Sequence, residues 1–456
     1  MNLNRRNVLA GSAALSLCPR PALPADTAQV LRPAPAEVQI APPSYPATKV
    51  WAFNGKIPGE PLRYRQGEIL AAVLENGLDE PTTIHWHGLR LPNAMDGAPG
   101  MTQATVPPGE RFTYRFALPD AGTFWYHPHA NSVEQISRGL AGVLVVEEQE
   151  PPEVDHDETI VLDDWRLTED AQIHDSFGNR HDQSHAGRIG NYITANGTDD
   201  LKFDVRPGER LRLRLVNTAT ARIFRLRLKG LRGWIAALDG MPLETLSEAG
   251  EVVIGPAQRA DLFADVTAEP GEDAYVASVE RDRTYAMASF AVAGSVQAER
   301  PAPVPLPPNP MPDFSVAGAR KVPMLMDGGA MRGMEGATWE GKRMDMRQLV
   351  QAGQFWAFSG VAGMSDEPFV EAALGEVIRV PMTNRTAFPH AMHLHGMHSR
   401  EVLPDGSLGP WRDTFLVNPD ETREIAFVAE NPGDWMFHCH MLSHQKSGMM
   451  TWIRVT

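Results

Sequence analysis

The residues with the clearest chemistry in this sequence lie between positions 437 and 449. Alternate side chains of an extended strand share a face, so His438 and His440 are expected to point one way and Cys439 the other. His444 and Met449 follow Cys439 at intervals of five residues, a spacing that suits a loop folding back over the strand end. A thiolate, an imidazole and a weak axial thioether, completed by one further histidine, form a blue-copper electron-transfer site. One strand is therefore predicted to serve two sites.

Further histidines occur in three clusters: His85-Trp86-His87-Gly88, His127-Pro128-His129 and His390-Ala391-Met392-His393-Leu394-His395. One His-x-His pair would be a weak signal, but four clusters in this order, with a cysteine between two histidines, form a specific pattern. On these motifs the sequence resembles the three-domain multicopper oxidases, the family that includes laccases and bacterial copper-efflux oxidases. The resemblance runs over essentially the whole mature chain.

The resemblance implies four copper ions, with ligands carried over residue by residue. The blue (type 1) copper takes His390, Cys439, His444 and the axial Met449. The mononuclear type 2 copper takes His85 and His393. The binuclear type 3 pair takes the remaining ligands, His87, His127, His129, His395, His438 and His440. The other histidines, expected to be surface or satisfied core residues, are His156, His174, His181, His185 and His398.

The resemblance also implies the reaction. Electrons from a reductant enter at the blue copper, pass from Cys439 to His438 and His440, and reduce dioxygen to water. Asp96 matches a family acidic residue near the oxygen site, so we expect it to assist proton supply, the alternative being an ordinary turn aspartate. Asp96 and Cys439 are thus the predicted catalytic residues. Family members often carry a glutamate where this chain has Gln445, which cannot ionise.

A methionine-rich segment bears on the reductant. Thioethers prefer Cu(I), and a similar segment precedes the third domain of metal-oxidising members. The alternative is that these methionines fill an irregular core or a lid. Residues 384–389 also lack the acidic and methionine residues that copper-efflux oxidases present as a cuprous docking site. The methionines concerned are Met311, Met324, Met326, Met331, Met334, Met344 and Met346.

We therefore expect a cuprous oxidase in copper tolerance, with laccase-type oxidation of phenols and aromatic amines as the alternative. Copper-free structural relatives lack the ligands that this chain keeps, and two-domain nitrite reductases lack a third module. The formal net charge of −15 disfavours nucleic acid or an anionic membrane surface as a partner. Dioxygen and a cuprous or small aromatic reductant remain, and we expect a monomer.

The first residues predict export. Arg5 and Arg6 precede a short apolar run that ends near Leu17, which is typical of a twin-arginine signal over residues 1–25 and of a periplasmic protein without a membrane span. A disordered basic tail is the alternative, and a lipoprotein anchored through Cys18 is disfavoured by the bulky Leu17. Cleavage removes Cys18 and leaves Cys439 alone, so the mature chain can form no internal disulfide.

The 456 residues repeat one module three times. A Gly-Glu pair begins a strand that reaches an asparagine nine residues after the glycine, at Asn76, Asn217 and Asn384. Nine residues further lie His85, Leu226 and His393, so the middle copy has lost its ligands. Alternation such as Leu211-Arg212-Leu213-Arg214-Leu215 predicts strands with one face toward water.

Short strands with Gly and Pro turns, and no long amphipathic helix, predict an all-β chain of antiparallel sandwiches. The family resemblance implies three consecutive cupredoxin-like Greek-key domains. We expect them at residues 40–150, 151–300 and 318–456, with the middle one free of copper. A proline-rich linker, residues 301–308, separates the second from the third.

Overall fold

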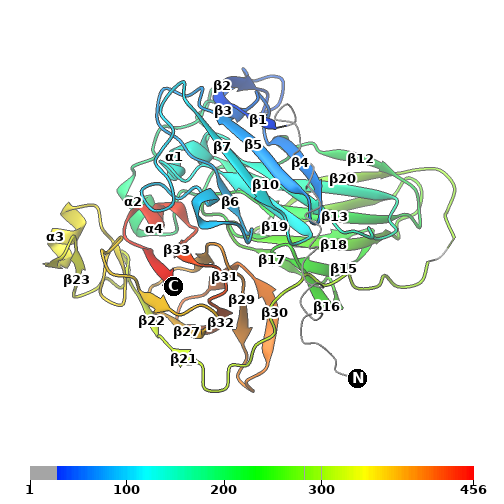
Figure 1. Ribbon diagram of the computed structural model, residues 1–456. Coiled ribbons are helices and arrows are strands. Elements are labelled where there is room, and N and C mark those ends of the chain that lie inside the picture. Colours follow the sequence, from blue (N-terminus) through cyan, green and yellow to red (C-terminus); the bar gives the residue numbers. More distant parts are fainter. Residues whose placement is uncertain (1–27, 282, 299) are drawn as a thin grey trace, which may run out of the picture.

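The computed structural model describes residues 28–281, 283–298 and 300–456. The predicted export signal and Cys18 lie outside the described residues. The described chain is almost entirely β and forms three successive sandwich units (Figure 1), as the sequence predicts. None of its helices is long and apolar enough to cross a membrane.

The first unit contains β1 to β9, in sheets ordered β1-β5-β7 and β4-β9-β8-β6 with a separate β2-β3 pair. Helix α1 (Ser132–Ser137) and a short 3₁₀ turn, η2 (Asn93–Met95), lie in its loops. The strands are β1 (Gln29–Leu31), β2 (Pro33–Val38), β3 (Thr48–Phe53), β4 (Gly59–Arg65), β5 (Ile69–Glu75), β6 (His85–His87), β7 (Arg111–Ala117), β8 (Gly122–His127) and β9 (Gly142–Glu147).

The middle unit contains β10 to β20, in sheets ordered β11-β10-β13-β18-β15-β16 and β12-β20-β19-β14-β17, and helix α2 (Arg180–Ser184). Its strands are β10 (His156–Trp165), β11 (Tyr192–Ala195), β12 (Lys202–Val205), β13 (Arg210–Asn217), β14 (Phe224–Lys229), β15 (Leu231–Leu238), β16 (Met241–Glu248), β17 (Val252–Ile254), β18 (Arg259–Val266), β19 (Asp273–Val279) and β20 (Thr284–Val292).

The third unit contains β21 to β34, in sheets ordered β25-β22-β27-β32-β29-β30, with β21 beside β27, and β26-β34-β33-β28-β31. It also carries the β23-β24 hairpin and helices α3 (Met346–Gln351) and α4 (Leu442–Lys446). Its strands are β21 (Arg320–Lys321), β22 (Met324–Gly328), β23 (Gly336–Trp339), β24 (Lys342–Asp345), β25 (Trp356–Phe358), β26 (Val370–Ala372), β27 (Val377–Asn384), β28 (His390–Leu394), β29 (Ser399–Val402), β30 (Leu408–Arg412), β31 (Thr414–Val417), β32 (Thr422–Val428), β33 (Gly433–Cys439) and β34 (Met450–Val455).

The sheets are mixed, so the prediction of purely antiparallel sandwiches is wrong in part. Strands β4 and β9 run parallel, as do β10 with β13 and β26 with β34. A chain that crosses to the opposite sheet and returns can place a strand beside an earlier one in the same direction. Such crossover connections account for the parallel pairs in these sandwiches.

The repeated asparagines have one structural role. Each is buried at the end of its strand, and its side-chain oxygen accepts the backbone N–H two residues on. Its amide donates to two carbonyl oxygens, for example Phe388 O and Val417 O from Asn384. The asparagine therefore fixes the loop that leads to the next strand, which in the first and third units carries the histidines.

Two apolar clusters organise the three units. The first and third units share one continuous cluster that includes Trp86 of β6 and Phe437 of β33. The middle unit has a cluster of its own, around Leu213 and Val276. The strands bearing the histidines consequently lie where the first and third units meet.

The prediction that one face of β13 points toward water is wrong. Arg212 and Arg214 are almost completely buried, because this face packs against the first unit. Arg212 pairs with Glu148 after β9 at 2.8 Å, and Arg214 donates to Thr123 Oγ1 of β8 at 2.9 Å. Period-two alternation identified the strand correctly, but the polar face is an interface of paired charges.

The close approach of Gly97 to the main chain just before β6 gives a testable prediction. Its φ is +83°, and a Cβ there would lie 1.9 Å from Ile84 O, just before β6. We expect Gly97→Ala to lower the free energy of unfolding by more than ~3 kcal/mol, since steric overlap adds to the left-handed backbone cost. Gly100→Ala, at φ +73° with no atom within 4 Å of its Cβ, should cost only ~1 kcal/mol in the same denaturant titration. Equal costs would show that the close contact with β6 is unimportant.

Candidate metal centres

Three buried side chains meet near the end of β33. Cys439 Sγ lies 3.6 Å from His390 Nδ1 of β28 and 3.9 Å from His444 Nδ1 of α4. The two Nδ1 atoms are 3.1 Å apart. Met449 is buried in the same apolar cluster as Cys439, and its carbonyl oxygen accepts the Cys439 N–H at 3.0 Å. The residues predicted for the blue site therefore lie together.

The outer nitrogens of the two imidazoles are held by fixed partners. His444 Nε2 donates to the carbonyl oxygen of His185 at 2.6 Å, which leaves the Nδ1 lone pair directed at Cys439. His390 Nε2 lies 2.7 Å from Thr386 Oγ1, in the loop fixed by Asn384. The repeat asparagine thus contributes to the orientation of His390.

A second group is a chamber lined by histidines from both the first and third units. Strand pairing places His85 opposite His127 and His393 opposite His438. Three Nε2–Nε2 distances between neighbouring rings are short: 3.0 Å for His395 and His438, 3.4 Å for His129 and His438, and 3.4 Å for His127 and His440. The chamber histidines are His85, His87, His127, His129, His393, His395, His438 and His440.

Backbone carbonyls set the direction of several of these rings. The Nδ1 atoms of His85, His127 and His393 lie 2.8 to 3.0 Å from the carbonyl oxygens of Asp96, Pro128 and Asp413. Because a carbonyl oxygen can only accept, the proton sits on Nδ1 and the Nε2 lone pair faces the chamber. His87 is turned the other way, with Nε2 directed at the Asp413 carboxylate and Nδ1 inward.

Several inward nitrogens have no hydrogen-bond partner among the described residues, including His85 Nε2, His87 Nδ1 and His393 Nε2. Burial, with the neighbouring imidazoles as a further cause, holds the pKa of His87, His129 and His393 well below the ordinary value. The rings of these three residues are therefore neutral at pH 7, and each keeps a lone pair that can bind a cation. This is the donor set of a cation site.

Similarity to known proteins identifies the family of this chain. The multicopper oxidase family matches residues 36–151, 156–295 and 340–456. The chain belongs to the multicopper oxidase family.

Relatives of this oxidase extend over nearly all of the chain. Multicopper oxidase MmcO of Mycobacterium tuberculosis is 30% identical and covers 92% of this chain and 85% of its own. Copper resistance protein A of Pseudomonas syringae pv. tomato is 26% identical, with 89% of each chain covered. The crystal structure of Lac15 from a marine microbial metagenome is 40% identical, with a TM-score of 0.77 over 94% of this chain and 100% of its own. These similarities support the cupredoxin-like character of the three sandwiches.

The residues present fit copper, which the family implies. One group offers Cys439 with two imidazoles, three offer imidazole nitrogens alone, and one combines His87 and His393 with the Asp413 carboxylate; within each group the ligand atoms lie within 4.8 Å of one another. Sulfur and nitrogen donors in this arrangement suit copper. Burial raises the pKa of Cys439 to about 12, so the thiol binds a metal only by losing its proton to solvent or a base.

Asp96 is placed between two chamber histidines. Its carboxylate lies 2.9 Å from His395 Nδ1 and 3.3 Å from His85 Nδ1, and the side chain is buried. It therefore orients both rings, a role that the sequence did not specify. A contribution to proton supply remains the prediction made from the family resemblance.

Gln445 lies at the solvent side of the chamber. It lines a groove of about 640 Å³ that also reaches His129, and it accepts a hydrogen bond from Ser132 Oγ at 3.3 Å. The groove joins the outer surface to a chamber histidine without an ionisable group at position 445. The same wall carries the methionines Met101, Met364, Met436 and Met450.

The histidines without a predicted role differ in environment. His174 is half exposed, and His156 Nε2 lies 3.1 Å from Glu209. His398 is buried with neither ring nitrogen hydrogen-bonded among the described residues, so the expectation of a satisfied core histidine is wrong there. His181 and His185 stack with ring centroids 3.9 Å apart, near the blue site.

The sequence analysis missed the polar residues behind the chamber. Asp413, Thr414 and Arg259 are buried and contact chamber histidines directly or through one another. Arg259 opens β18 of the middle unit and lies outside every metal-binding motif. No signal in the sequence distinguishes it, because β18 also carries the charged residues Asp261 and Asp265.

Replacement of the thiol tests the blue site. Cys439→Ser keeps the side-chain size but removes the sulfur ligand, so we expect loss of the blue absorption, of about one copper per chain and of oxidase turnover. The far-ultraviolet circular dichroism should be unchanged, because the substitution is nearly isosteric. Retained blue colour or turnover would show that the site lies elsewhere.

The metal-free protein should lose stability in acid. Burial lowers the pKa of His438 and His444 to about 4, so between pH 6.5 and 4 the unfolded chain binds more protons than the folded one. The contribution of each histidine to the free energy of unfolding is fully present above pH 6.5 and falls as the pH drops toward 4. The total loss is on the order of 3 kcal/mol per histidine once the pH is below both the folded and the unfolded pKa.

Urea midpoints of the metal-free protein at pH 7, 6 and 5 measure this slope. His438→Gln should reduce it, whereas His174→Gln, at a half-exposed position, serves as the matched control. A midpoint that does not change over this range would contradict the neutral, buried state of the imidazoles.

Proposed function

We propose that this multicopper oxidase couples four one-electron oxidations of Cu(I) to the reduction of dioxygen to water. Copper ions bound in the two centres would supply one-electron transfer and dioxygen binding. The proposed ligands are the sequence-derived set: His390, Cys439, His444 and Met449 for type 1, His85 and His393 for type 2, and His87, His127, His129, His395, His438 and His440 for type 3.

The covalent link between the centres supports the coupled reaction. Cys439 of the blue site is bonded through the main chain to His438 and His440, which point into the chamber. A ligand side chain of the blue site and ligand side chains of the chamber are thus carried by adjacent residues of the main chain. The proposal of electron passage through β33 rests on this connection.

The residues that surround His444 at the blue site support Cu(I) as the electron donor. Helix α2 covers the outer edge of His444, through the hydrogen bond to His185 O. Ala330 N donates to Ser184 O at 2.9 Å, which brings the next residue, Met331, beside the end of α2. Met331 is 69% exposed. An exposed thioether and the His181–His185 pair therefore gather soft and borderline donors near the blue site.

The other methionines of the segment have different environments. Met324 and Met326 of β22 are buried in the apolar cluster shared by the first and third units, so the packing interpretation is correct for them. Met334 and Met344 pack against Leu349 and its neighbours. The proposal of Cu(I) recruitment consequently rests on Met331 and not on the segment as a whole.

We further propose the domain limits 40–150, 151–300 and 318–456, export by the twin-arginine route, and a monomeric periplasmic enzyme. The described strand pairings support the two later boundaries, because none joins strands of different units, whereas β1 and β2 lie before residue 40 and pair with β5 and β3 of the first unit. Arg5-Arg6 and the following apolar run support the export route. The relative named Copper resistance protein A supports a role in copper tolerance.

Oxygen consumption by copper-loaded protein tests the donor. We expect rapid turnover with Cu(I), and phenol oxidation that depends on added Cu(II). Met331→Leu should lower kcat/KM for Cu(I) about tenfold, the equivalent of ~1.4 kcal/mol, because it removes the exposed sulfur while keeping the size. Phenol oxidation should be unaffected.

Met326→Leu, which is buried in the core, is the matched control and should leave both activities near the wild-type values. Rapid phenol turnover that ignores added copper, together with an ineffective Met331→Leu change, would favour the laccase alternative.

A further inference from the structure

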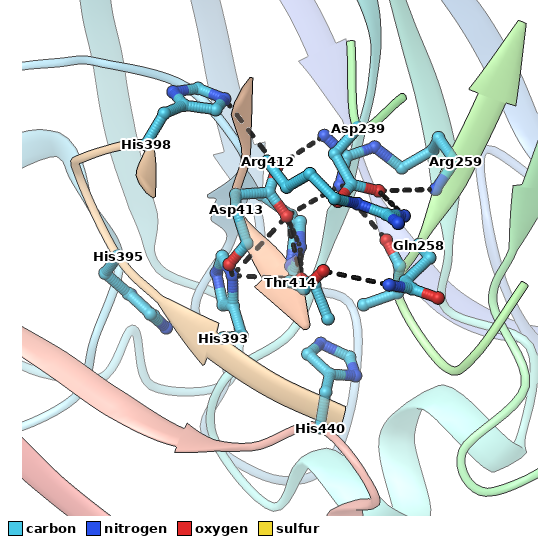
Figure 2. Close-up of polar contacts among 12 residues, drawn as sticks. Asp239, Gln258, Arg259, His393, His395, His398, Arg412, Asp413, Thr414 and His440 are labelled. Atoms are coloured by element: carbon cyan, nitrogen blue, oxygen red, sulfur yellow. Dashed lines mark hydrogen bonds and ion pairs between the residues drawn. The ribbon is translucent and has the colours of Figure 1, made fainter. Parts of the chain in front are cut away.

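A buried polar network lies behind the chamber where all three units meet (Figure 2). Asp413, between β30 and β31, is 1% exposed, and Arg259 of the middle unit is fully buried. The guanidinium donates twice to the carboxylate, from Nη1 to Oδ1 at 2.9 Å and from Nη2 to Oδ2 at 2.6 Å. Arg259 Nε also donates to Thr123 O of the first unit at 3.1 Å. One side chain thus binds both neighbouring units.

The same carboxylate contacts a chamber histidine. Asp413 Oδ1 lies 3.1 Å from His87 Nε2, and the Asp413 carbonyl oxygen accepts from His393 Nδ1 at 2.9 Å. Thr414 Oγ1 lies 3.3 Å from each of those two nitrogens. The rings of His87 and His393 stack with centroids 3.7 Å apart. Their free nitrogens, His87 Nδ1 and His393 Nε2, are those that face the chamber.

His87 depends on this network more than the histidines held by backbone carbonyls. Its outer partner is a side-chain carboxylate, whose direction is fixed by the ion pair with Arg259. His87, His393 and Asp413 also form a group that could hold a metal, but both carboxylate oxygens are already engaged by the guanidinium. Asp413 therefore acts from behind the rings.

The middle unit supplies further contacts to the same point. Gln258 Nε2 donates to Thr414 O at 2.8 Å. Asp239 accepts from the Arg259 backbone N–H at 2.9 Å and from Arg412 Nε at 2.8 Å. Space is tight, since a Cβ at Gly88, directly after His87, would lie 2.4 Å from both Arg259 Nη2 and Asp413 Oδ2. The guanidinium has little room to adopt another position.

We propose that Arg259 is a positioning residue through which the copper-free middle unit sets the inward nitrogens of His87 and His393. It touches neither substrate nor the metal-facing nitrogens; it acts through Asp413 and Thr414. The inference rests on the proposed function, because it takes His393 as a type 2 ligand and His87 as a type 3 ligand. The middle unit would then take part in building the oxygen-side centre, beyond its role as a spacer.

The test compares two buried arginines of the middle unit. Arg259→Lys keeps the charge but loses the paired donation to Asp413. Arg212→Lys does the same to the Glu148 pair, which also joins the middle and first units but contacts no histidine of the chamber. Both variants are loaded with copper beside the wild type, and the readouts are copper per chain, blue absorption, the type 2 electron paramagnetic resonance signal and the rate of copper loss to a chelator.

For Arg259→Lys we expect unchanged blue absorption, a weakened or altered type 2 signal and at least a tenfold faster loss of the chamber copper. Arg212→Lys should match the wild type in all four readouts, even if its thermal midpoint falls. If Arg259→Lys does not fold, Gln258→Leu should show the same changes in smaller measure. An unaltered type 2 signal and chelator rate in the folded Arg259 variant, or equal changes in both arginine variants, would overturn the proposal. A wild type without blue and type 2 signals would instead refute the proposed function.

Discussion

The structure depends on the convergence of buried imidazole nitrogens from two different sandwiches. Neither the first nor the third sandwich provides this alone, because each supplies half of the rings. His85 and His127 face each other in one unit, and His393 and His438 do so in the other. The shared apolar cluster brings the two pairs together, and burial lowers the pKa of His127, His393 and His438.

The middle sandwich contacts its neighbours through buried arginines as well as through apolar side chains. Arg212, Arg214 and Arg259 are all buried, and each meets a carboxylate, with further donation to Thr123 from two of them. Buried ion pairs of this kind contribute little net stability compared with apolar packing, but an unmatched charge is strongly unfavourable. The pairs therefore specify one relative placement of the units, and the chamber needs that placement to within a fraction of an ångström.

The sequence predicted those features that depend on local periodicity or on spacing. Alternation along β33 separated Cys439 from His438 and His440, and the three-fold repeat identified the middle unit as lacking ligands. In that unit Leu226 lies opposite Ser278, where each of the other two units pairs two histidines. Features that depend on the facing surface could not be predicted: the burial of Arg214 and the engagement of Asp413 both follow from a neighbouring unit.

The chamber also relates metal binding to folding. Without a cation, His85 Nε2 and His393 Nε2 are buried lone pairs with no donor in the part of the chain that the structure describes, an arrangement that costs free energy relative to the hydrated unfolded chain. A cation that binds the folded chamber removes this cost, so its binding energy adds directly to stability. The fold nevertheless does not rely on the metal for its core, since extensive apolar clusters and the asparagine-fixed loops lie outside the chamber. Folding can therefore precede loading, with copper completing a site that the three sandwiches have already shaped.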